Sequence, residues 1–165
     1  MSVVLLRVDQ RLLHGQVVEG WVPHLKVDGV VVADDRIAAD PISTIAMTAA
    51  CPVRVKLAVM SVADAAKAAV SGALPGARTL VLVGTIGSLA RVWDGGLRAE
   101  QVNVGNVPIA EGRARVTNCV ALSAEEVREL DRLAAAGAAV EVRTVPKDRA
   151  SDLQAVHAAV DGGRS

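Results

Sequence analysis

Four short apolar runs, separated by segments with helical spacing, constrain the fold of this chain more than any other feature of its sequence. The runs are rich in β-branched residues and cover Val3–Val8, Gly29–Ala33, Val53–Val59 and Thr79–Val83. Continuous apolar strands of this kind are typical of parallel sheets that are buried on both faces. Strands that alternate with helices predict parallel βαβ units with right-handed crossovers.

The segments between these runs carry the start and stop signals of helices. Helices are predicted over Gly15–His24, Pro41–Ala50, Ser61–Ser71 and Thr85–Asp94. Asp40 is a suitable N-cap for the second helix, with Pro41 at its first position, and Ser61 caps the third. Gly95 and Gly96 end the fourth helix, as glycines commonly do at helix C-termini.

The second half of the chain is less regular but continues the same pattern. Ser123 and Glu126 form a capping box that starts one helix, and Gly137 stops it. We expect one domain over residues 1–165, with the α/β fold of a single open, mostly parallel twisted sheet flanked by helices. The further predicted elements are strands at Gln101–Val104, Ala114–Val120 and Ala138–Val145, helices over Ser123–Ala136 and Ser151–Val160, and a frayed tail at Gly162–Ser165.

The composition excludes several classes of protein. Eighteen basic and 18 acidic residues cancel and no Lys/Arg-rich run occurs, so we expect no binding of nucleic acid or of a membrane surface. The two Trp, without any Phe or Tyr, do not suit a base-stacking platform. No run approaches the roughly 20 apolar residues of a membrane span, and the apolar run at the N-terminus is too short for a signal peptide. Together with Cys51 and Cys119, expected as two buried reduced thiols, these features predict a cytoplasmic protein.

The densest group of polar residues follows the first predicted strand. Ligands bind beyond the carboxyl ends of strands in open parallel sheets, so this loop is the predicted active-site loop, and we expect it to be exposed at His14. A neutral ring nitrogen of His14 is a good phosphoryl acceptor near neutral pH, and an arginine can bind phosphate oxygens in bidentate fashion. The loop reads Arg7-Val8-Asp9-Gln10-Arg11-Leu12-Leu13-His14-Gly15-Gln16.

The other residues of this loop fit the same chemistry. Gly15 lets backbone N–H groups approach an anion, and the helix that begins there directs its positive end toward it. Asp9 is unfavourable beside a phosphate unless an arginine neutralises it, so we expect it to orient Arg11 or the ring of His14. On chemistry alone, a hydrogen-bonded structural histidine stays the alternative for His14.

Other polar residues have simpler interpretations. We expect His24 and His157 to be solvated or packed, and Trp21 to belong to the core. Asp34 and Asp35 are expected as capping or loop carboxylates, with Asp34 also a candidate for the rim of the site. Ordinary surface charges are expected at Arg113, Arg115, Arg143, Lys147 and Arg149. The sequence lacks nucleotide-binding fingerprints, a nucleophile elbow and metal-ligand spacing, so no cofactor and no metal are expected.

The stretch from Arg7 to Val17 closely resembles the signature of the phosphotransferase-system (PTS) IIB components of the mannose/fructose/sorbose family. That signature is approximately R-(I/V)-D-x-R-L-(I/L)-H-G-Q-V, and its His is the phosphorylated residue. Weaker similarities follow in the same order, to about residue 150. They lie at Trp21, Val30–Asp34, Asn103-Val104-Gly105, Ser123–Gly137 and Val140–Arg143.

The resemblance implies a phosphoryl carrier of a sugar phosphotransferase system. A phosphorylated IIA protein or domain would donate to the δ1 nitrogen of His14, and an IIC/IID membrane pair would deliver the group to an incoming sugar. The implied activity is that of a protein-Nπ-phosphohistidine–sugar phosphotransferase. Arg11 and Gly15 would belong to the phosphate cradle, and Arg7 and Asp9 match the motif as further phosphate-binding candidates. Homo-oligomerisation stays open.

Two departures from the family pattern bear on specificity. The family commonly has Phe-Thr-Asn-Pro after the fourth strand, where this chain has Val83-Gly84-Thr85-Ile86, and a second Gly where this chain has Asn106. Both loops should flank His14, so they would affect partner or substrate choice more than phosphorylation. Two other hypotheses stay open: a His-phosphorylated regulatory relay without sugar transport, and a small-molecule-binding α/β module in which His14 is structural.

Overall fold

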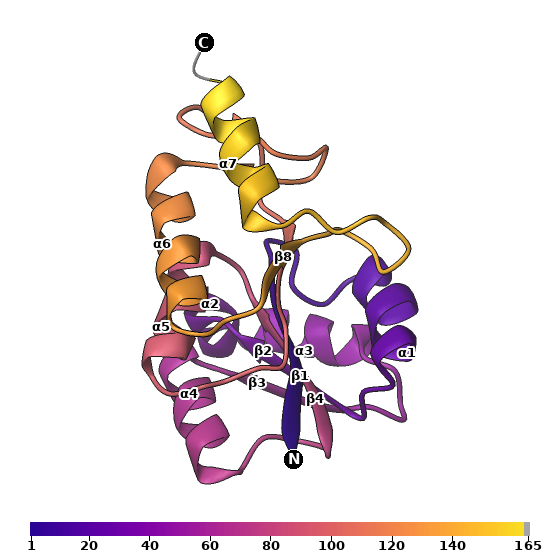
Figure 1. Ribbon diagram of the computed structural model, residues 1–165. Helices are drawn as coiled ribbons and strands as arrows, with labels where there is room; N and C mark the ends of the chain where they lie inside the picture. Colours follow the sequence, from indigo (N-terminus) through magenta and orange to yellow (C-terminus); the bar gives the residue numbers. More distant parts are fainter. Residues whose placement is uncertain (164–165) are drawn as a thin grey trace.

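The computed structural model describes residues 1–163, and its centre is an open sheet of six parallel strands (Figure 1). The strand order is β3-β2-β4-β1-β5-β8, and a separate antiparallel hairpin joins β6 and β7. This architecture confirms the predicted fold class. The strands are β1 (Ser2–Asp9), β2 (Gly29–Ala33), β3 (Lys56–Met60), β4 (Arg78–Val83), β5 (Val102–Asn106), β6 (Ala114–Arg115), β7 (Ala121–Leu122) and β8 (Val140–Val142).

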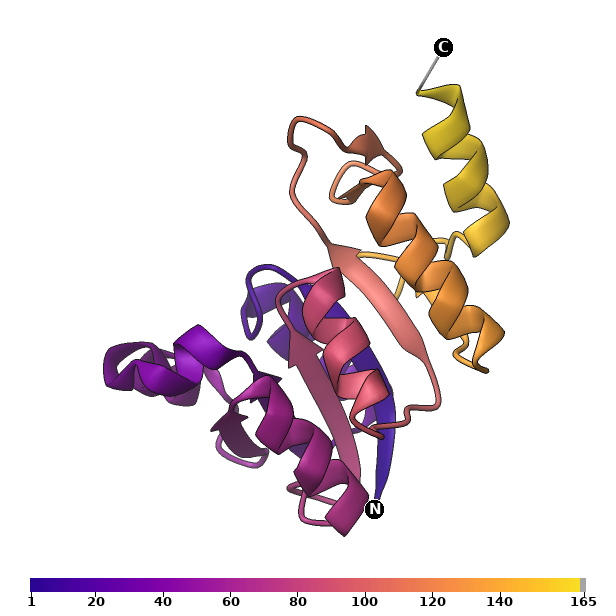
Figure 2. The same ribbon diagram turned by 90° about the vertical axis from the view of Figure 1, so that its left-hand side faces the viewer.

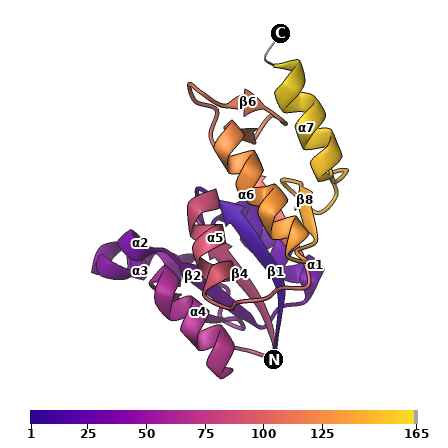
Figure 3. The same cartoon turned by 60° about the vertical axis from the view of Figure 1, so that its left-hand side comes forward.

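Helices cover both faces of the sheet. They are η1 (Val17–Trp21), α1 (Val22–Leu25), α2 (Asp35–Ala39), α3 (Pro41–Ala50), α4 (Val62–Ser71), α5 (Ile86–Asp94), α6 (Ala124–Ala135) and α7 (Leu153–Gly162). One buried cluster lies between the sheet and α4, α5, α6 and α7, and a second lies between the sheet and η1, α1, α2 and α3. In Figure 3, α4, α5 and α6 line one face, while α2 and α3 form the end farthest from α7.

Several predicted helix starts are confirmed by their hydrogen bonds. Asp40 accepts from the backbone N–H groups of Ile42 and Ser43 at 3.2 and 3.3 Å, and Pro41 is the first residue of α3. Ser61 caps α4, and Ser123 with Glu126 forms the complete capping box of α6. Such caps form because the first N–H groups of a helix have no partner within it.

Three expectations about individual elements were wrong, and one helix was missed. The third strand begins at Lys56, because residues 52–55 form a turn closed by the bond from Val55 N–H to the Pro52 carbonyl. The segment predicted as one strand at residues 114–120 holds β6 and the turn that leads to β7. β8 spans only three residues, because the chain then turns and returns at Ser151 to bond with Val142. α2 was not predicted at all; it is a five-residue helix with few residues over which periodicity could appear.

The end of the chain is only partly described. α7 starts two residues later than expected, at Leu153, with Asp152 as its N-cap, and it runs to Gly162. The frayed tail predicted for residues 162–165 therefore overlaps this helix at its first residue. Residues 164 and 165 of that prediction lie outside the described residues. None of the helices within residues 1–163 combines the length and the apolar character needed to cross a membrane.

The strand order places the active-site loop at a switch point of the sheet. β1 and β4 are neighbours, yet the chain leaves β1 toward η1 and α1 on one face and leaves β4 toward α5 on the other (Figure 2). Divergent loops leave a crevice at the carboxyl ends of such strands, and ligands of open α/β sheets bind there.

Candidate active site

Two buried leucines hold the loop after β1. Leu12 and Leu13 are each 4% exposed and pack into the core on the α1 face. Leu12 adopts a left-handed backbone conformation (φ 57°), which is unfavourable for a residue with a branched side chain. Its N–H donates to the Asp9 carbonyl at 2.9 Å and closes a tight turn. The turn leaves Arg11 exposed at its tip and returns the chain to the sheet at His14.

The helix after His14 begins at the loop and contains a π-helical segment. The His14 carbonyl accepts from Val17 and Val18, and residues 15–25 are continuously helical. Within this segment the Val22 N–H bonds to the Val17 carbonyl, one residue farther back than in an α-helix. Wider turns of this kind are frequent at functional sites. The expected helix over residues 15–24 is confirmed, with this difference in its hydrogen bonding.

Asp9 holds one nitrogen of the His14 ring. His14 Nε2 lies 2.9 Å from Asp9 Oδ2, and the Asp9 side chain is fully buried. An ionised carboxylate can only accept hydrogen bonds, so Nε2 carries the proton and donates it. Nδ1 is then the nitrogen with the free lone pair, and within residues 1–163 it has no hydrogen-bond partner. The ring is therefore set in the tautomer that a nucleophilic Nδ1 requires.

The same carboxylate also organises the turn. Asp9 Oδ1 accepts from the backbone N–H of Arg11 at 2.9 Å. Both contacts expected for Asp9, with Arg11 and with the His14 ring, are thus present in the structure. The His14 side chain itself is only 8% exposed, whereas we expected it in an exposed loop. That expectation was wrong because Leu12 and Leu13 draw the loop onto the sheet.

Arg7 lies behind Asp9 and does not reach solvent. Its Nη2 and Nε donate to Asp9 Oδ2 at 2.9 and 3.3 Å, and both side chains are fully buried. Its Nη1 donates to Asn103 Oδ1 and to the Arg143 carbonyl. Burial lowers the pKa of Arg7 below its ordinary value, and the neighbouring Asp9 charge opposes that change. Arg7 is therefore a buried counter-charge to Asp9 in this structure.

Arg11 and Gly15 differ from Arg7 in being open to a ligand. Both residues are exposed, and within residues 1–163 the Arg11 guanidinium makes no hydrogen bond or ion pair. A Cβ atom added at Gly15 would meet nothing within 4 Å. Two residues near His14 in the sequence could therefore receive a ligand: Gly15 leaves open space, and Arg11 has a guanidinium without a partner within residues 1–163.

Trp21 is a core residue, as expected, and it connects the helix to the strand edge. It is 1% exposed, and its indole N–H donates to the Thr144 carbonyl at 2.9 Å. The guanidinium groups of Arg7 and Arg143 lie 5.1 and 5.2 Å from its ring centroid, within the range of cation–π attraction. Arg143 was expected as a surface charge; instead it packs on Trp21 and donates to Glu141 at 3.2 Å.

The remaining candidates have structural partners. Asp34 caps α2 by accepting from Arg36 and Ile37, and it also lies at the rim, since a Cβ at Gly84 would come within 3.2 Å of it. Asp35 pairs with Arg91 at 2.8 Å. The other two histidines lie away from this loop: His24 makes an edge contact with Trp21, and His157 bonds to Asp131.

The departure after the fourth strand keeps the geometry of a helix start. Thr85 is the N-cap of α5 and accepts from the Ser88 N–H at 3.0 Å, a role that Asn also performs well. Ile86 follows at the first helical position and is 1% exposed, where the family pattern has Pro. The two sequences thus favour the same backbone at this helix start.

Sequence reasoning noted Asn103, Gly105 and Glu141 only as points of family resemblance, and it missed their contacts behind the loop and the contact of Thr144 with Trp21. Asn103 is fully buried in β5, where a polar side chain is unusual and would have been the available signal. The others come from β5, β8 and the segment after β8, which only the sheet brings beside β1.

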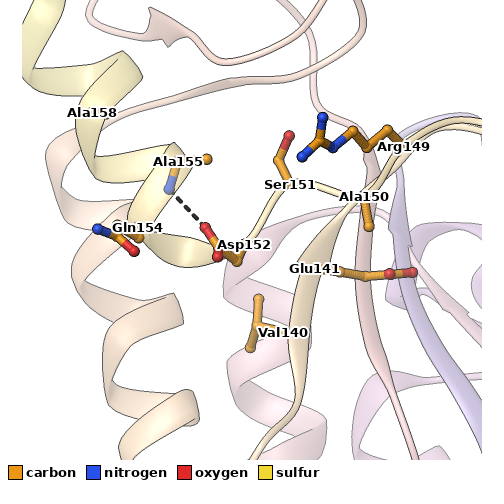
Figure 4. A pocket seen from close by; sticks show the side chains of 9 residues that line it. All are labelled: Val140, Glu141, Arg149, Ala150, Ser151, Asp152, Gln154, Ala155 and Ala158. Carbon is orange, nitrogen blue, oxygen red and sulfur yellow. Dashed lines mark hydrogen bonds between the residues drawn. The ribbon is translucent and has the colours of Figure 1, made fainter.

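A pocket of about 560 Å³ opens at the β8 edge of the sheet, beside the start of α7 (Figure 4). Its lining includes Glu141, Arg149, Ser151, Asp152 and Gln154. Asp152 is occupied as the cap of α7 through its bond with the Ala155 N–H, drawn in Figure 4. None of the loop residues between Arg7 and Gln16 lines this pocket, and Glu141 is the residue that it shares with the contacts behind the loop.

Comparisons with known proteins find similarity to PTS components along nearly the whole chain. The fructose-specific PTS EIIB component of Bacillus subtilis (strain 168) is 28% identical over 153 residues, 93% of this chain and 94% of its own length. The mannose-specific PTS EIIAB component of Escherichia coli (strain K12) is 30% identical over 148 residues, 90% of this chain. That alignment covers 46% of the E. coli protein, so the chain spans about half the length of this relative.

Solved structures and a family model complete the comparison. The crystal structure of manxB from Thermoanaerobacter tengcongensis superposes with a TM-score of 0.84 and 30% identity, covering 94% of each chain. The family model described as the PTS system sorbose subfamily IIB component matches residues 3–161. The buried Asp9–His14 pair therefore lies in a protein with both the sequence and the fold of that family. The chain belongs to the sorbose subfamily of PTS IIB components.

Proposed function

We propose that this protein carries a phosphoryl group on Nδ1 of His14. The observation that carries the proposal is the 2.9 Å contact between Asp9 Oδ2 and His14 Nε2, which leaves Nδ1 as the nitrogen with a free lone pair. The motif that contains both residues supports it by resemblance. Nδ1 is buried in this structure, so it must become accessible before a donor can reach it.

The transfer step follows from this geometry. Nδ1 attacks the phosphorus of a donor phosphohistidine, and the new Nδ1–P bond forms as the donor's N–P bond breaks. The donor ring recovers its lone pair, while the proton of His14 stays on Nε2 and the ring becomes positively charged. Asp9 lies at the atom where this charge develops, so it stabilises the transition state as well as the tautomer.

The phosphate cradle is supplied by the exposed residues. The unpaired guanidinium of Arg11 binds phosphoryl oxygens, and the open backbone at Gly15 admits them beside the helix start. Arg7 and Asp9, the two other candidates, serve the phosphate indirectly in this proposal. Arg7 neutralises Asp9, and Asp9 orients His14, since both side chains are fully buried.

The partners follow from the family. PTS IIB components work with IIA proteins and with IIC/IID membrane components. We infer that this chain receives its phosphoryl group from a phosphorylated IIA domain in the cytoplasm and passes it to a sugar taken up through an IIC/IID pair. The relatives' names specify mannose and fructose, so a hexose is the substrate class to test first.

Labelling from a phosphorylated IIA domain tests this function. Wild-type protein should acquire an acid-labile, base-stable label, and His14→Gln should acquire none while remaining folded. His24→Ala and His157→Ala are the controls and should label normally. Label on either of those residues, or full labelling of His14→Gln, would refute the assignment. Release of the label to a hexose in IIC/IID membranes separates a transport role from a purely regulatory relay.

A further inference from the structure

Arg7 is held in place by residues from two other strands of the sheet. Nη1 donates to Asn103 Oδ1 in β5 and to the Arg143 carbonyl just after β8. The Asn103 amide group donates in turn to Glu141 Oε1 at 3.1 Å and to the Arg143 carbonyl at 3.0 Å. These contacts fix which way the amide faces, because its oxygen must meet Arg7 and its nitrogen must meet the two acceptors.

Gly105 provides the space that the guanidinium occupies. A Cβ atom at this position would lie 2.0 Å from both Cζ and Nη1 of Arg7 and 2.2 Å from Nη2. No side chain other than hydrogen fits there while Arg7 keeps its position. Gly105 needs no special backbone conformation, since its φ is not in the left-handed region. The close approach of Arg7 is therefore the physical reason for a glycine at this position.

The chain of contacts then leads directly to the reacting ring. Arg7 holds Asp9 Oδ2 through Nε and Nη2, and the same oxygen accepts from His14 Nε2. A shift of the guanidinium would release one side of the carboxylate and allow it to rotate. Rotation would break the contact that keeps the proton on Nε2 and the lone pair on Nδ1.

We propose that Asn103 and Gly105 are positioning residues for phosphoryl transfer, acting through Arg7 and Asp9 on the orientation and tautomer of His14. The proposal rests on the proposed function of His14 as the acceptor. It assigns to β5 a role in the reaction, although neither Asn103 nor Gly105 touches the phosphoryl group. The charged groups joined in this network are Arg7 and Asp9 of β1, Glu141 of β8 and Arg143.

Two readouts separate positioning from a merely structural role. The first is the proton signal of His14 Nε2–H by NMR, measured without phosphate. It should exchange slowly in wild-type protein, because it donates to a carboxylate that is fully buried. The second is the rate of His14 phosphorylation by phosphoramidate, a small donor that needs no protein partner, expressed per folded molecule.

Gly105→Ala tests the steric part of the proposal. It should abolish the protected Nε2–H signal and slow phosphorylation by about 10- to 100-fold, the range expected when a reacting group is displaced by about 1 Å. Gly20→Ala is the matched control. A Cβ there would meet only Pro146 Cδ at 3.4 Å, so signal and rate should stay at wild-type values. Folded Gly105→Ala with an unchanged signal and rate would overturn the proposal.

Asn103 tests the polar part and also decides the case if Gly105→Ala fails to fold. Asn103→Ala removes the oxygen that holds Nη1, so the Nε2–H signal should be lost and the rate should fall at least tenfold. Glu141→Gln is the control, because it keeps an acceptor oxygen for the Asn103 amide and leaves the contacts of Arg7 unchanged, so it should keep the signal and a rate within about threefold of wild type. Folded Asn103→Ala with an unchanged signal and rate would refute the positioning role.

These outcomes are distinct from failure of the proposed function. If wild-type His14 accepts no phosphoryl group, the proposed function fails, but the Nε2–H signal still reports on the positioning chain. If wild-type protein is labelled and the signal is equally protected in every variant, the function stands and the positioning role is refuted.

Discussion

The buried pair of Arg7 and Asp9 allows a quantitative test of how the site is built. Both side chains are fully buried, and Asp9 accepts from Arg7, Arg11 and His14. Asp9→Asn keeps the shape but removes the charge, which leaves the Arg7 cation buried without a counter-ion. Breaking one partner of a buried ion pair typically costs about 3–5 kcal/mol. We therefore expect the free energy of unfolding to fall by about that amount.

The same loss of unfolding free energy can be expressed as a change in melting temperature. For a chain of 165 residues, each kcal/mol corresponds to a change in Tm of about 2–4 °C, so Asp9→Asn should lower Tm by about 6–20 °C. The double variant R7M/D9N removes both charges and should be more stable than Asp9→Asn alone, because no buried charge is left unpaired. Phosphorylation should stay low in both variants, since neither retains the carboxylate that orients His14.

The assay is urea unfolding followed by circular dichroism, with phosphorylation of the native proteins measured in parallel. A double-mutant cycle from wild type, Arg7→Met, Asp9→Asn and R7M/D9N gives the coupling free energy between the two residues. A loss below about 1 kcal/mol for Asp9→Asn would refute the reasoning, because a loss that small is typical of exposed pairs. Wild-type phosphorylation in Asp9→Asn would show that the carboxylate does not orient the ring.

Three further predictions concern the rim of the site and the sheet. Arg11→Lys should slow transfer from IIA, because lysine keeps the charge but lacks the planar guanidinium that binds two oxygens, and Arg11→Ala should slow it more. Both variants should show little change in Tm, and wild-type transfer rates in both would place Arg11 outside the cradle. Replacing Gly84–Ile86 by Thr-Asn-Pro should leave acceptance from IIA intact and alter release to sugar, and the reverse pattern in the two rates would contradict this division. Backbone N–H groups of Arg78 and Ala77 lower the pKa of Asp28 below its ordinary value, so its contribution to stability is present above about pH 4 and is lost as pH falls through the lowered value. Asp28→Asn should therefore reduce the pH dependence of the free energy of unfolding across that range, and an unchanged pH dependence would contradict a stabilising role for these hydrogen bonds.

The order of strands and helices could be predicted because it depends on local signals. Apolar runs, capping residues such as Asp40 and Ser123, and glycines at helix ends act over a few residues, and the structure confirms them. The errors lie where local signals are weak. The start of β3, the split between β6 and β7, and the short α2 depend on which segments find a partner strand or helix.

The loop from Arg7 to Gln16 could be singled out for a similar reason. Its residues are adjacent in the sequence, so their chemistry is visible together before any fold is known. The sequence alone did not separate the roles of the two arginines. Arg11 lies at the tip of a turn and is exposed, whereas Arg7 is a strand residue whose side chain is fully buried.

Only the tertiary structure decided what surrounds Arg7. Asn103 lies 96 residues away in the chain and the Arg143 carbonyl lies 136 residues away, yet both accept from the same guanidinium nitrogen. Pairing of β1 with β5, and of β5 with β8, brings them together. A buried charge needs hydrogen-bond and ion-pair partners, because burying it without them costs a large free energy. The partners can come from any segment that the fold places nearby. These partners of Arg7 link β1, β5 and β8 behind His14. The guanidinium occupies the space of a side chain at position 105, which explains the glycine there.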